Sequence, residues 1–447
     1  MSRSTSGISK GVDSSLIWLY LLLVSVGIMA IFAATYREGD PVVASFFSFK
    51  TDYSRQFYFF VVAGVIGIFI LLTDSKFFTA TANLWYAIGI FLLLLVFPFH
   101  SRVKGTESII RFGAIQFQPA EFCKVCVCLA LSKYLSLPDQ DFSKTRSQLI
   151  AAAIALLPAV MSIMQHETGL ALVYFSFFIV MYREGLPATI LVVGFSLAAL
   201  VVATLLVDKN LLAVILTGIA LIMLYFMWRH NKKDKTVLFK VILLWGICVG
   251  IQRFGVPVLF QRVFQPYQVE RIFSTIGRDV PEEYMKIEDR HKLEVEGKKK
   301  KDTDYNVKQS KIAIGSGGVL GKGLLKGTQT RYDFVPEQRT DFIFCTIGEG
   351  FGFLGTFTLM VIYLVLLFRI VAVAERQRSV FSRCYAYGVA SVLFFHIVIN
   401  ICMTVGLAPV IGIPLPFISY GGTALLTFTI LLFILIRLDA DRQMVLR

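Results

Sequence analysis

The chain has 447 residues, of which 56% are hydrophobic and only 17% are charged, and its mean hydropathy is +0.69. This composition excludes an ordinary soluble protein and is typical of a polytopic membrane protein. In a soluble protein the net charge of +14 would suggest nucleic-acid binding, but basic residues at helix ends on one side of a membrane explain it better. We therefore expect membrane lipids, and no nucleic acid, among its partners.

Twelve apolar segments are predicted to cross the membrane, because a bilayer core needs about 20 apolar helical residues, with about 17 to 25 tolerated. They are Leu16–Ala34, Phe57–Leu72, Asn83–Phe99, Phe117–Tyr134, Gln148–Met164, Gly169–Tyr182, Leu186–Val207, Leu211–Trp228, Val241–Phe260, Phe342–Phe368, Tyr385–Val405 and Tyr420–Ile436. The expected fold class is an all-α polytopic membrane protein with about 10 to 12 transmembrane helices and one large extracellular loop before the last three.

The short connections predict the orientation, because Lys and Arg accumulate on the cytoplasmic side. With the N-terminus inside, the basic connections 229–240 and 369–383 and the tail from Arg437 all lie in the cytoplasm. Both termini are then cytoplasmic, and the long polar connection lies outside. The predicted regions are the N-terminal transmembrane helices, the large extracellular loop, and the last three helices with a short cytoplasmic tail: residues 1–260, 261–340 and 341–447.

The middle of the large loop, Arg278–Asp304, mixes both signs of charge and predicts a short amphipathic helix followed by a linker. Its Lys298–Lys301 run has two interpretations. The lysines are simply solvated, or they bind acidic lipid headgroups or an anionic substrate.

The stretch Gln309–Gly352 joins a glycine-rich run to an acidic cluster of Asp333, Glu337 and Asp341, directly before an apolar helix. A carboxylate at the mouth of a membrane helix is unusual, and we interpret this stretch as the chemical centre. The run GSGGVLGKG (315–323) is similar to a phosphate-binding loop, although glycines also permit close backbone packing. Lys322 near its end and Lys326 just after it favour an anionic ligand such as a pyrophosphate leaving group.

Glu121 and Lys124, in FQPAEFCK, are the most prominent ionisable pair inside an apolar segment. A charge at membrane depth costs about 2.5–3.5 kcal/mol, and residues three apart share a helix face, so the two can neutralise each other. Two interpretations stay open. The pair is a structural ion pair, or it faces a polar cavity that Arg111 and Gln118 also line.

Three further motifs have simpler expectations. Glu167 of QHETG (Gln165–Gly169) is expected to cap the helix that follows. The Pro- and Gly-rich segment 406–422 predicts a re-entrant loop, because irregular backbone is tolerated at membrane depth only against protein or a wet cavity. Its Ser419 could hydrogen-bond a ligand headgroup. The CxxC of Cys123 and Cys126 is more typical of packing than of metal binding.

Five motifs in order resemble the SEDS glycosyltransferases (RodA/FtsW): FQPAEFCK, YQVERI (Tyr267–Ile272), QSKIAIGSGGVLGKG, YDFVPEQRTDFIF and GLAPVIGIPLPFISYGG. The resemblance spans most of the chain and is closest to the RodA branch. It implies a multi-pass enzyme of the bacterial cytoplasmic membrane that polymerises lipid II into peptidoglycan glycan strands on the outer face, for cell elongation and rod shape. It also implies a class B penicillin-binding protein, a transpeptidase, as partner.

The resemblance places the family's essential aspartate at Asp341. This chain departs from the family pattern with Arg339 for a histidine, Asp333 for a glutamate, and Ser108-Ile109 for an Arg-Trp pair, which leaves Arg111. The acid of QPDLG is here Glu167. The family fold has ten transmembrane helices, so the resemblance implies an extra helical pair within residues 186–260.

Glycosyl transfer from a lipid pyrophosphate needs a base and cations but no acid, since pyrophosphate leaves unprotonated. Asp341 is the predicted base, and Lys322, Arg339 or Arg111 would offset the leaving-group charge. Glu337 and Asp333 would orient Arg339, or a divalent cation (Mg²⁺ or Mn²⁺) held by Asp341 and Glu337. The substrate-binding set is predicted as Arg111, Glu121, Lys124, Lys322, Asp333, Glu337, Arg339 and Ser419.

Other interpretations remain open at this point. Asp341 could be only an N-cap for the helix after it. A lipid II flippase would use the same cavity without bond chemistry, and the division-specific (FtsW-like) polymerase would perform the same reaction. A secondary transporter would place acidic residues at mid-membrane, whereas this acidic cluster lies at the interface.

Overall fold

The computed structural model describes residues 11–36, 42–103, 106–112, 115–138, 141–230, 235–262, 305–408 and 410–442, with 269, 273, 280, 281 and 284. The chain forms two compact units, residues 1–186 with 305–447, and residues 187–304. The first unit contains every residue predicted for the site, from Arg111 to Ser419.

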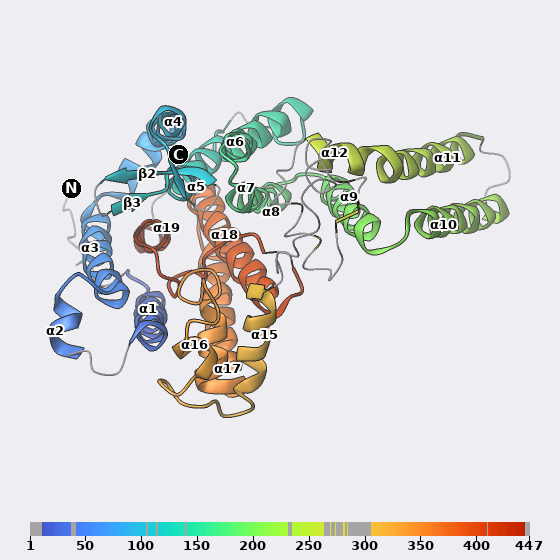
Figure 1. Cartoon of the computed structure of the whole chain (residues 1–447). Coiled ribbons are helices and arrows are strands. Elements are labelled where there is room, and N and C mark those ends of the chain that lie inside the picture. Colours follow the sequence, from blue (N-terminus) through green and yellow to red (C-terminus); the bar gives the residue numbers. More distant parts are fainter. Residues whose placement is uncertain are drawn as a thin grey trace, which may run out of the picture. The chain divides into compact units, whose positions relative to one another are not determined.

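The first unit is a bundle of helices (Figure 1). Its helices are α1 (Ser14–Thr35), α2 (Val42–Phe47), α3 (Asp52–Leu72), α4 (Ser75–Phe99), α5 (Pro119–Leu135), α6 (Thr145–Met164), α7 (Thr168–Tyr174), α8 (Phe177–Arg183), α15 (Tyr305–Ser316), α16 (Thr328–Arg331), α17 (Ile343–Glu375), α18 (Val380–Val405) and α19 (Gly422–Ala440). Local signals set several of these ends. Pro119 occupies the first turn of α5, as expected, and α18 stops at Gly406, whose φ of 77° suits glycine.

Ten helices of the described residues are long and apolar enough to cross a membrane. They are α1, α3, α4, α6, α9, α10, α17, α18 and α19, and the continuous helix Leu238–Arg262. Two predicted segments are shorter: α5 has 17 residues, and the predicted segment Gly169–Tyr182 is broken into α7 and α8. The prediction of an all-α multi-pass membrane protein is confirmed.

The centre of the first unit is formed by α18 and α19. We compared the most apolar 18-residue stretch of each helix. The buried share of this stretch is 61% in α18 and 72% in α19, but only 22% in α3 and in α4. The difference shows which helices are surrounded by protein and which present apolar side chains outward. Helix α18 packs against α5, α17 and α19. Residues that are far apart in the sequence therefore lie next to one another along α18.

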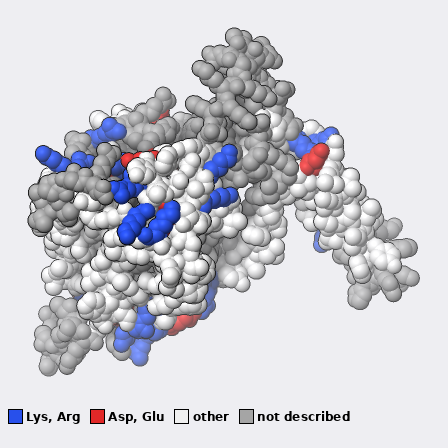
Figure 2. All heavy atoms as spheres, turned by 60° about the horizontal axis from the view of Figure 1, so that its bottom comes forward, with Lys and Arg blue, Asp and Glu red and all other residues white. Residues whose placement is uncertain are grey.

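The surface of the described residues is largely uncharged. Figure 2 shows wide areas without charged side chains, and on this face Lys and Arg outnumber Asp and Glu. Large apolar side chains such as Phe69 and Phe368 are well exposed, which in a membrane protein is the surface that contacts lipid.

A small antiparallel sheet, which the sequence did not predict, joins α4 to α5. Its strands are β1 (Ser101–Val103), β2 (Thr106–Phe112) and β3 (Ile115–Phe117), in the order β1-β2-β3. Arg111 on β2 pairs with Gln116 on β3. The sheet is attached to α19 because Thr423 Oγ1 donates a hydrogen bond to the carbonyl of Gln116 at 3.0 Å.

The second unit contains α9 (Ala188–Leu206), α10 (Lys209–His230), α11 (Lys235–Gly250), the π-helical turn η2 (Ile251–Gly255) and α12 (Val256–Arg262). Helices α10 and α11 pack side by side (Figure 1), and Trp245 donates a 3.1 Å hydrogen bond to Thr217 across them. This unit holds the region in which the extra pair was predicted. The predicted amphipathic helix of Arg278–Asp304 lies outside the described residues except 280, 281 and 284.

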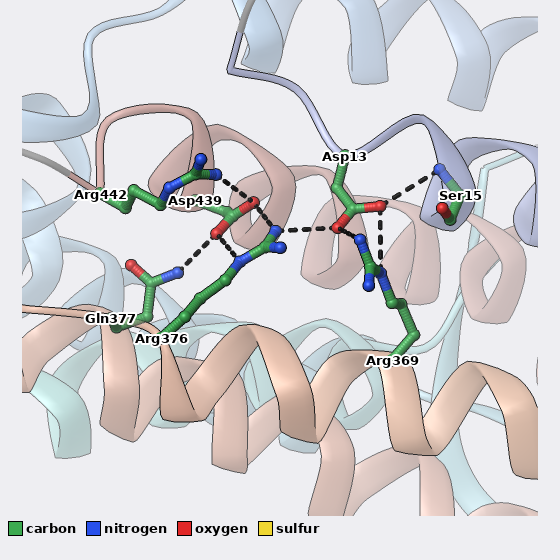
Figure 3. A network of polar contacts seen from close by, with 7 residues as sticks. All are labelled: Asp13, Ser15, Arg369, Arg376, Gln377, Asp439 and Arg442. Carbon is green, nitrogen blue, oxygen red and sulfur yellow. Dashed lines mark hydrogen bonds and ion pairs between the residues drawn. The ribbon is translucent and has the colours of Figure 1, made fainter.

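The far end of α17 from Asp341 carries a polar network (Figure 3) that we name the Asp13–Asp439 clamp, formed by Asp13, Arg369, Arg376, Gln377 and Asp439. Asp13 Oδ2 forms ion pairs with Nη2 of Arg369 and with Nη2 of Arg376, each at 2.8 Å. Arg376 and Gln377 also bond Asp439, each at 2.8 Å. The clamp therefore joins the start of α1 to the ends of α17 and α19.

Candidate functional site

Asp341 stands immediately before α17. The helix begins at Ile343, its N-cap residue is Phe342, and no side chain caps it, so Asp341 is not at the N-cap position. The Asp341 side chain is partly exposed. Gly412 lies beside it, since a Cβ placed on Gly412 would come 3.4 Å from Asp341 Oδ2. One face of the carboxylate is thus bounded by backbone without a side chain.

The main chain at Asp341 is held by three consecutive hydrogen bonds. The carbonyls of residues 339–341 accept, in order, from the Tyr420 amide at 2.9 Å, the Ser419 hydroxyl at 2.6 Å and the Asn400 side-chain amide at 2.8 Å. Ser419 and Asn400 are completely or almost completely buried. The position of Asp341 is therefore determined by α18 and the segment that follows it.

The Pro- and Gly-rich segment is irregular, as predicted, between the end of α18 and the start of α19. It is deeply packed: Ile413, Leu415 and Phe417 are buried, and the Tyr363 hydroxyl donates to the carbonyl of Pro416 at 2.6 Å. The predicted ligand-binding residue Ser419 lies here, and its hydroxyl also accepts from the Leu415 amide.

Glu121 and Lys124 form a buried ion pair at 2.6 Å, and both residues are 1% exposed or less. The Lys124 ammonium also lies 2.8 Å from Nε2 of His396 and 5.1 Å from the centre of the Phe428 ring. Since the ammonium can only donate, His396 Nε2 accepts and Nδ1 carries the proton, which is donated to the carbonyl of Pro414 at 3.1 Å. His396 therefore connects the Glu121–Lys124 pair to the Pro- and Gly-rich segment.

The remaining residues of the acidic cluster have partners close by in space. Gln338 donates to Asp333 at 2.7 Å, and the Thr340 hydroxyl donates to Glu337 at 2.8 Å. Arg339 forms an ion pair with Asp52 at the start of α3. Sequence reasoning did not connect Asp52 with this segment, because nothing in the primary structure places residues so far apart together.

The glycine-rich run packs on α17 through exchanged backbone hydrogen bonds. Gly352 has φ 65° and interrupts the helix, so the amides of residues 353 and 354 donate to Gly318 and Val319. In return, the amides of residues 322 and 323 donate to the carbonyls of residues 349 and 350 at 3.0 and 2.9 Å. Of the two interpretations of these glycines, the structure therefore realises the close backbone packing. Residues 309–316 of the predicted polar loop are helical, in α15.

Glu349 is the central acceptor of this region and was missed in the sequence. Its carboxylate accepts from Lys322 at 2.8 Å, from the amides of Gln329 and Thr330 at 2.9 Å each, and from the Thr330 hydroxyl at 2.9 Å. The residue has no exposed surface. An ionisable residue inside an apolar run was the signal that could have identified it.

Around QHETG, Glu167 does occupy the N-cap position of α7, but its side chain makes no cap hydrogen bond. It accepts from the Ser108 hydroxyl at 2.7 Å, and Ser108 accepts from Gln118 at 3.3 Å. The expected position at the start of the helix is therefore confirmed, but the carboxylate accepts its hydrogen bond from the small sheet and not from the backbone of α7. Arg111 on the same strand is exposed.

Metal ligands were considered at Asp341 and Glu337. Within the part of the chain that the structure describes, no three His, Cys, Asp or Glu side chains are grouped as metal ligands. All seven cysteines are unpaired thiols, and Cys123 and Cys126 are completely buried. Gly89 packs directly on both, which agrees with the packing interpretation of the CxxC.

Comparison with known families decides the classification. Residues 14–239 and 195–444 match the FtsW, RodA and SpoVE family, described as cell cycle protein. The chain belongs to this family. The expected RodA-like character agrees with a relative named peptidoglycan glycosyltransferase RodA from Treponema pallidum, 28% identical over 96% of this chain and 97% of the relative.

Other relatives and solved structures agree with this family. Peptidoglycan glycosyltransferase MrdB of Escherichia coli K12 is 28% identical over 80% of this chain and 78% of its own. The fold matches a chain of a peptidoglycan synthase complex with a TM-score of 0.64 and 21% identity, over 97% of this chain and 99% of that one. It also matches the crystal structure of Thermus thermophilus RodA with a TM-score of 0.58 and 21% identity, at the same coverage.

Proposed function

We propose that this FtsW, RodA and SpoVE family member is a peptidoglycan glycosyltransferase that polymerises lipid II, with Asp341 as general base. The observation that carries the proposal is the position of Asp341, a partly exposed carboxylate on a main chain fixed by three consecutive hydrogen bonds. A base contributes when it is held within hydrogen-bond reach of the proton that it removes. The relatives' names supply the reaction class.

In the proposed reaction, Asp341 removes the proton of the acceptor sugar's 4-hydroxyl. The oxygen attacks the anomeric carbon of the donor with inversion, a new glycosidic C–O bond forms, and the bond from that carbon to the pyrophosphate oxygen breaks. Undecaprenyl pyrophosphate leaves with the bonding electron pair. The proton passes from Asp341 to water, which restores the carboxylate.

The cations proposed for the pyrophosphate differ in their surroundings. Lys322 and Arg339 are already paired with Glu349 and Asp52, whereas the exposed Arg111 is on the small sheet. An arriving pyrophosphate would therefore have to share the first two with carboxylates, and the growing negative charge would strengthen those contacts as the bond breaks. A divalent cation, if one takes part, would be held by Asp341 and Glu337. No step above depends on it.

The remaining parts of the proposal concern place and partner. In the proposed orientation, the connections rich in Lys and Arg lie inside. Both termini are then in the cytoplasm, and Asp341 is at the outer face, where lipid II is consumed. Elongation is the proposed process, which is supported by 28% identity to the RodA relative over 97% of its length, against 26% identity to an FtsW of Buchnera aphidicola over 90% of its length. A class B penicillin-binding protein is the proposed partner, which the likeness to a chain of a peptidoglycan synthase complex supports.

The decisive experiment uses purified protein, reconstituted with lipid II, with and without a class B penicillin-binding protein. Wild type should yield glycan polymer, and Asp341→Asn, which keeps the size of the side chain, should lower the rate by about 100-fold or more, since a general base typically contributes about 10²- to 10⁴-fold. Polymer at the wild-type rate from Asp341→Asn would refute the base. Movement of lipid II between leaflets without polymer would favour a flippase.

A further inference from the structure

Asn400 is a buried side chain between the two parts of the site that the sequence treats separately. Its Nδ2 donates to the carbonyl of Asp341 at 2.8 Å and to the carbonyl of Ile413 at 2.7 Å. One donor group thus joins the residue proposed as the base to the irregular segment. Asn400 is completely buried.

His396 lies one turn before Asn400 on the same face of α18, since residues four apart align along a helix. It bonds the carbonyl of Pro414, the neighbour of Ile413, and receives Lys124 on its other nitrogen. The two side chains therefore fix consecutive carbonyls of the irregular segment. Along this face the buried Glu121–Lys124 pair is connected to the main chain of Asp341.

The amide of Asn400 is incompletely satisfied. Its Oδ1 is buried and has no hydrogen-bond partner among the described residues. A buried polar atom without a partner costs stability, and an apolar residue of the same size would avoid that cost. The orientation is nevertheless forced, because a flipped amide would turn oxygen toward two carbonyl oxygens.

We propose that Asn400 is a positioning residue for the glycosyl transfer, and that it acts by setting where the Asp341 carboxylate stands relative to the acceptor hydroxyl. The inference rests on the proposed role of Asp341. Gly412, adjacent to Ile413, borders the carboxylate, so a shift in the segment held by Asn400 would also change the space beside the base. Misplacement by about 1 Å at a reacting group can cost about 100-fold in rate.

The test measures polymerisation of lipid II by the full-length protein with Asn400→Leu, which removes both donors and keeps the branched shape of the side chain, and with Asn400→Ser. The smaller serine leaves room for water to reach the two carbonyls, so it is expected to fold even if leucine does not. The polymerisation rate of each variant is divided by the concentration of folded, monodisperse protein. The matched control is Ser391→Ala, a buried residue of the same helix whose hydroxyl donates to the carbonyl of Tyr387 in the preceding turn.

The expected result is a fall in kcat of about 10- to 100-fold with KM within about twofold, together with a shift in the acid limb of the pH profile of kcat. The control should change none of these. Unchanged kcat and pH profile in a folded Asn400 variant would overturn the inference, as would an effect confined to KM or to the folded yield. Asp341→Asn is measured in parallel: if it keeps full activity, the proposed base fails, and if it is inactive while both Asn400 variants are normal, only this inference fails.

Discussion

Lys322 donates a 2.8 Å hydrogen bond from its ammonium group to Oε1 of Glu349, a carboxylate with no exposed surface. The lysine that sequence alone assigns to a pyrophosphate is therefore also a structural partner. Glu349 binds the amides of residues 329 and 330 as well, so it holds the glycine-rich segment and the loop after it against α17. Substitutions at the two residues should have unequal effects.

We expect Glu349→Gln to lower the free energy of unfolding by about 1.5–3 kcal/mol, the range for hydrogen bonds to a charged group. The new amide group would also face backbone donors that need an acceptor. Lys322→Met should cost less, because Glu349 keeps its backbone and hydroxyl donors. Thermal unfolding in detergent compares the two, and equal losses would contradict the central role of Glu349.

The exchanged hydrogen bonds between the glycine run and α17 predict a sharp difference between two glycines. Gly321 has φ 82°, and an added Cβ would lie 2.2 Å from the carbonyl oxygen of Gly350. Gly321→Ala should therefore destabilise the protein by about 2 kcal/mol or more.

Gly315, in α15, is the matched control, since an added Cβ would meet nothing within 4 Å. Gly315→Ala should be neutral or stabilising by up to about 1 kcal/mol, from helix propensity alone. Melting temperatures of both variants, measured at the same pH, test this predicted difference in stability. A stable Gly321→Ala protein would mean that the run does not pack on α17 in this way.

The buried Glu121–Lys124 pair can be tested as a structural element apart from any contact with substrate. Lys124→Met leaves a carboxylate buried without its cation and should cost about 3–5 kcal/mol. Adding Glu121→Gln removes that charge and should restore most of the stability. Polymerisation by the stable double variant then tests the pair's role: activity near wild type indicates a purely structural pair, and inactivity indicates that the pair also contributes to the reaction.

The Asp13–Asp439 clamp predicts a dependence of stability on pH. Burial raises the pKa of Asp13, but hydrogen bonds and charges from Arg369 and Arg376 outweigh it and hold the pKa below its ordinary value of 3.8. A pKa depressed by folding contributes stability that is fully present above the unfolded-state pKa and is lost as pH falls through the folded-state pKa.

Asp13→Asn should consequently lower the melting temperature near neutral pH, and the difference from wild type should shrink below about pH 4. The measurement is a series of melts from pH 7 to the lowest pH at which wild type stays folded. A difference that grows on acidification would have the wrong sign for a depressed carboxyl pKa.

Much of this architecture follows from composition. Apolar segments of bilayer length predicted the membrane helices, because hydrocarbon requires the backbone to satisfy its own hydrogen bonds, and Pro119 marked a helix start. The irregular segment after α18 was also predictable, since its prolines and glycines exclude a regular helix. Asp341, Glu121 and Lys124 were identifiable because ionisable groups are costly near a membrane.

Other features depended on contacts between distant parts of the chain. Arg339 pairs with Asp52, Lys124 contacts His396, and Asn400 donates to the carbonyl of Asp341. Each contact joins segments that are far apart in the sequence, and side-chain periodicity does not encode which segments meet. The glycine run shows the same limit. Its residues permit either phosphate binding or close packing, and only the interruption of α17 at Gly352, which leaves two carbonyls for the amides of residues 322 and 323, decided between them.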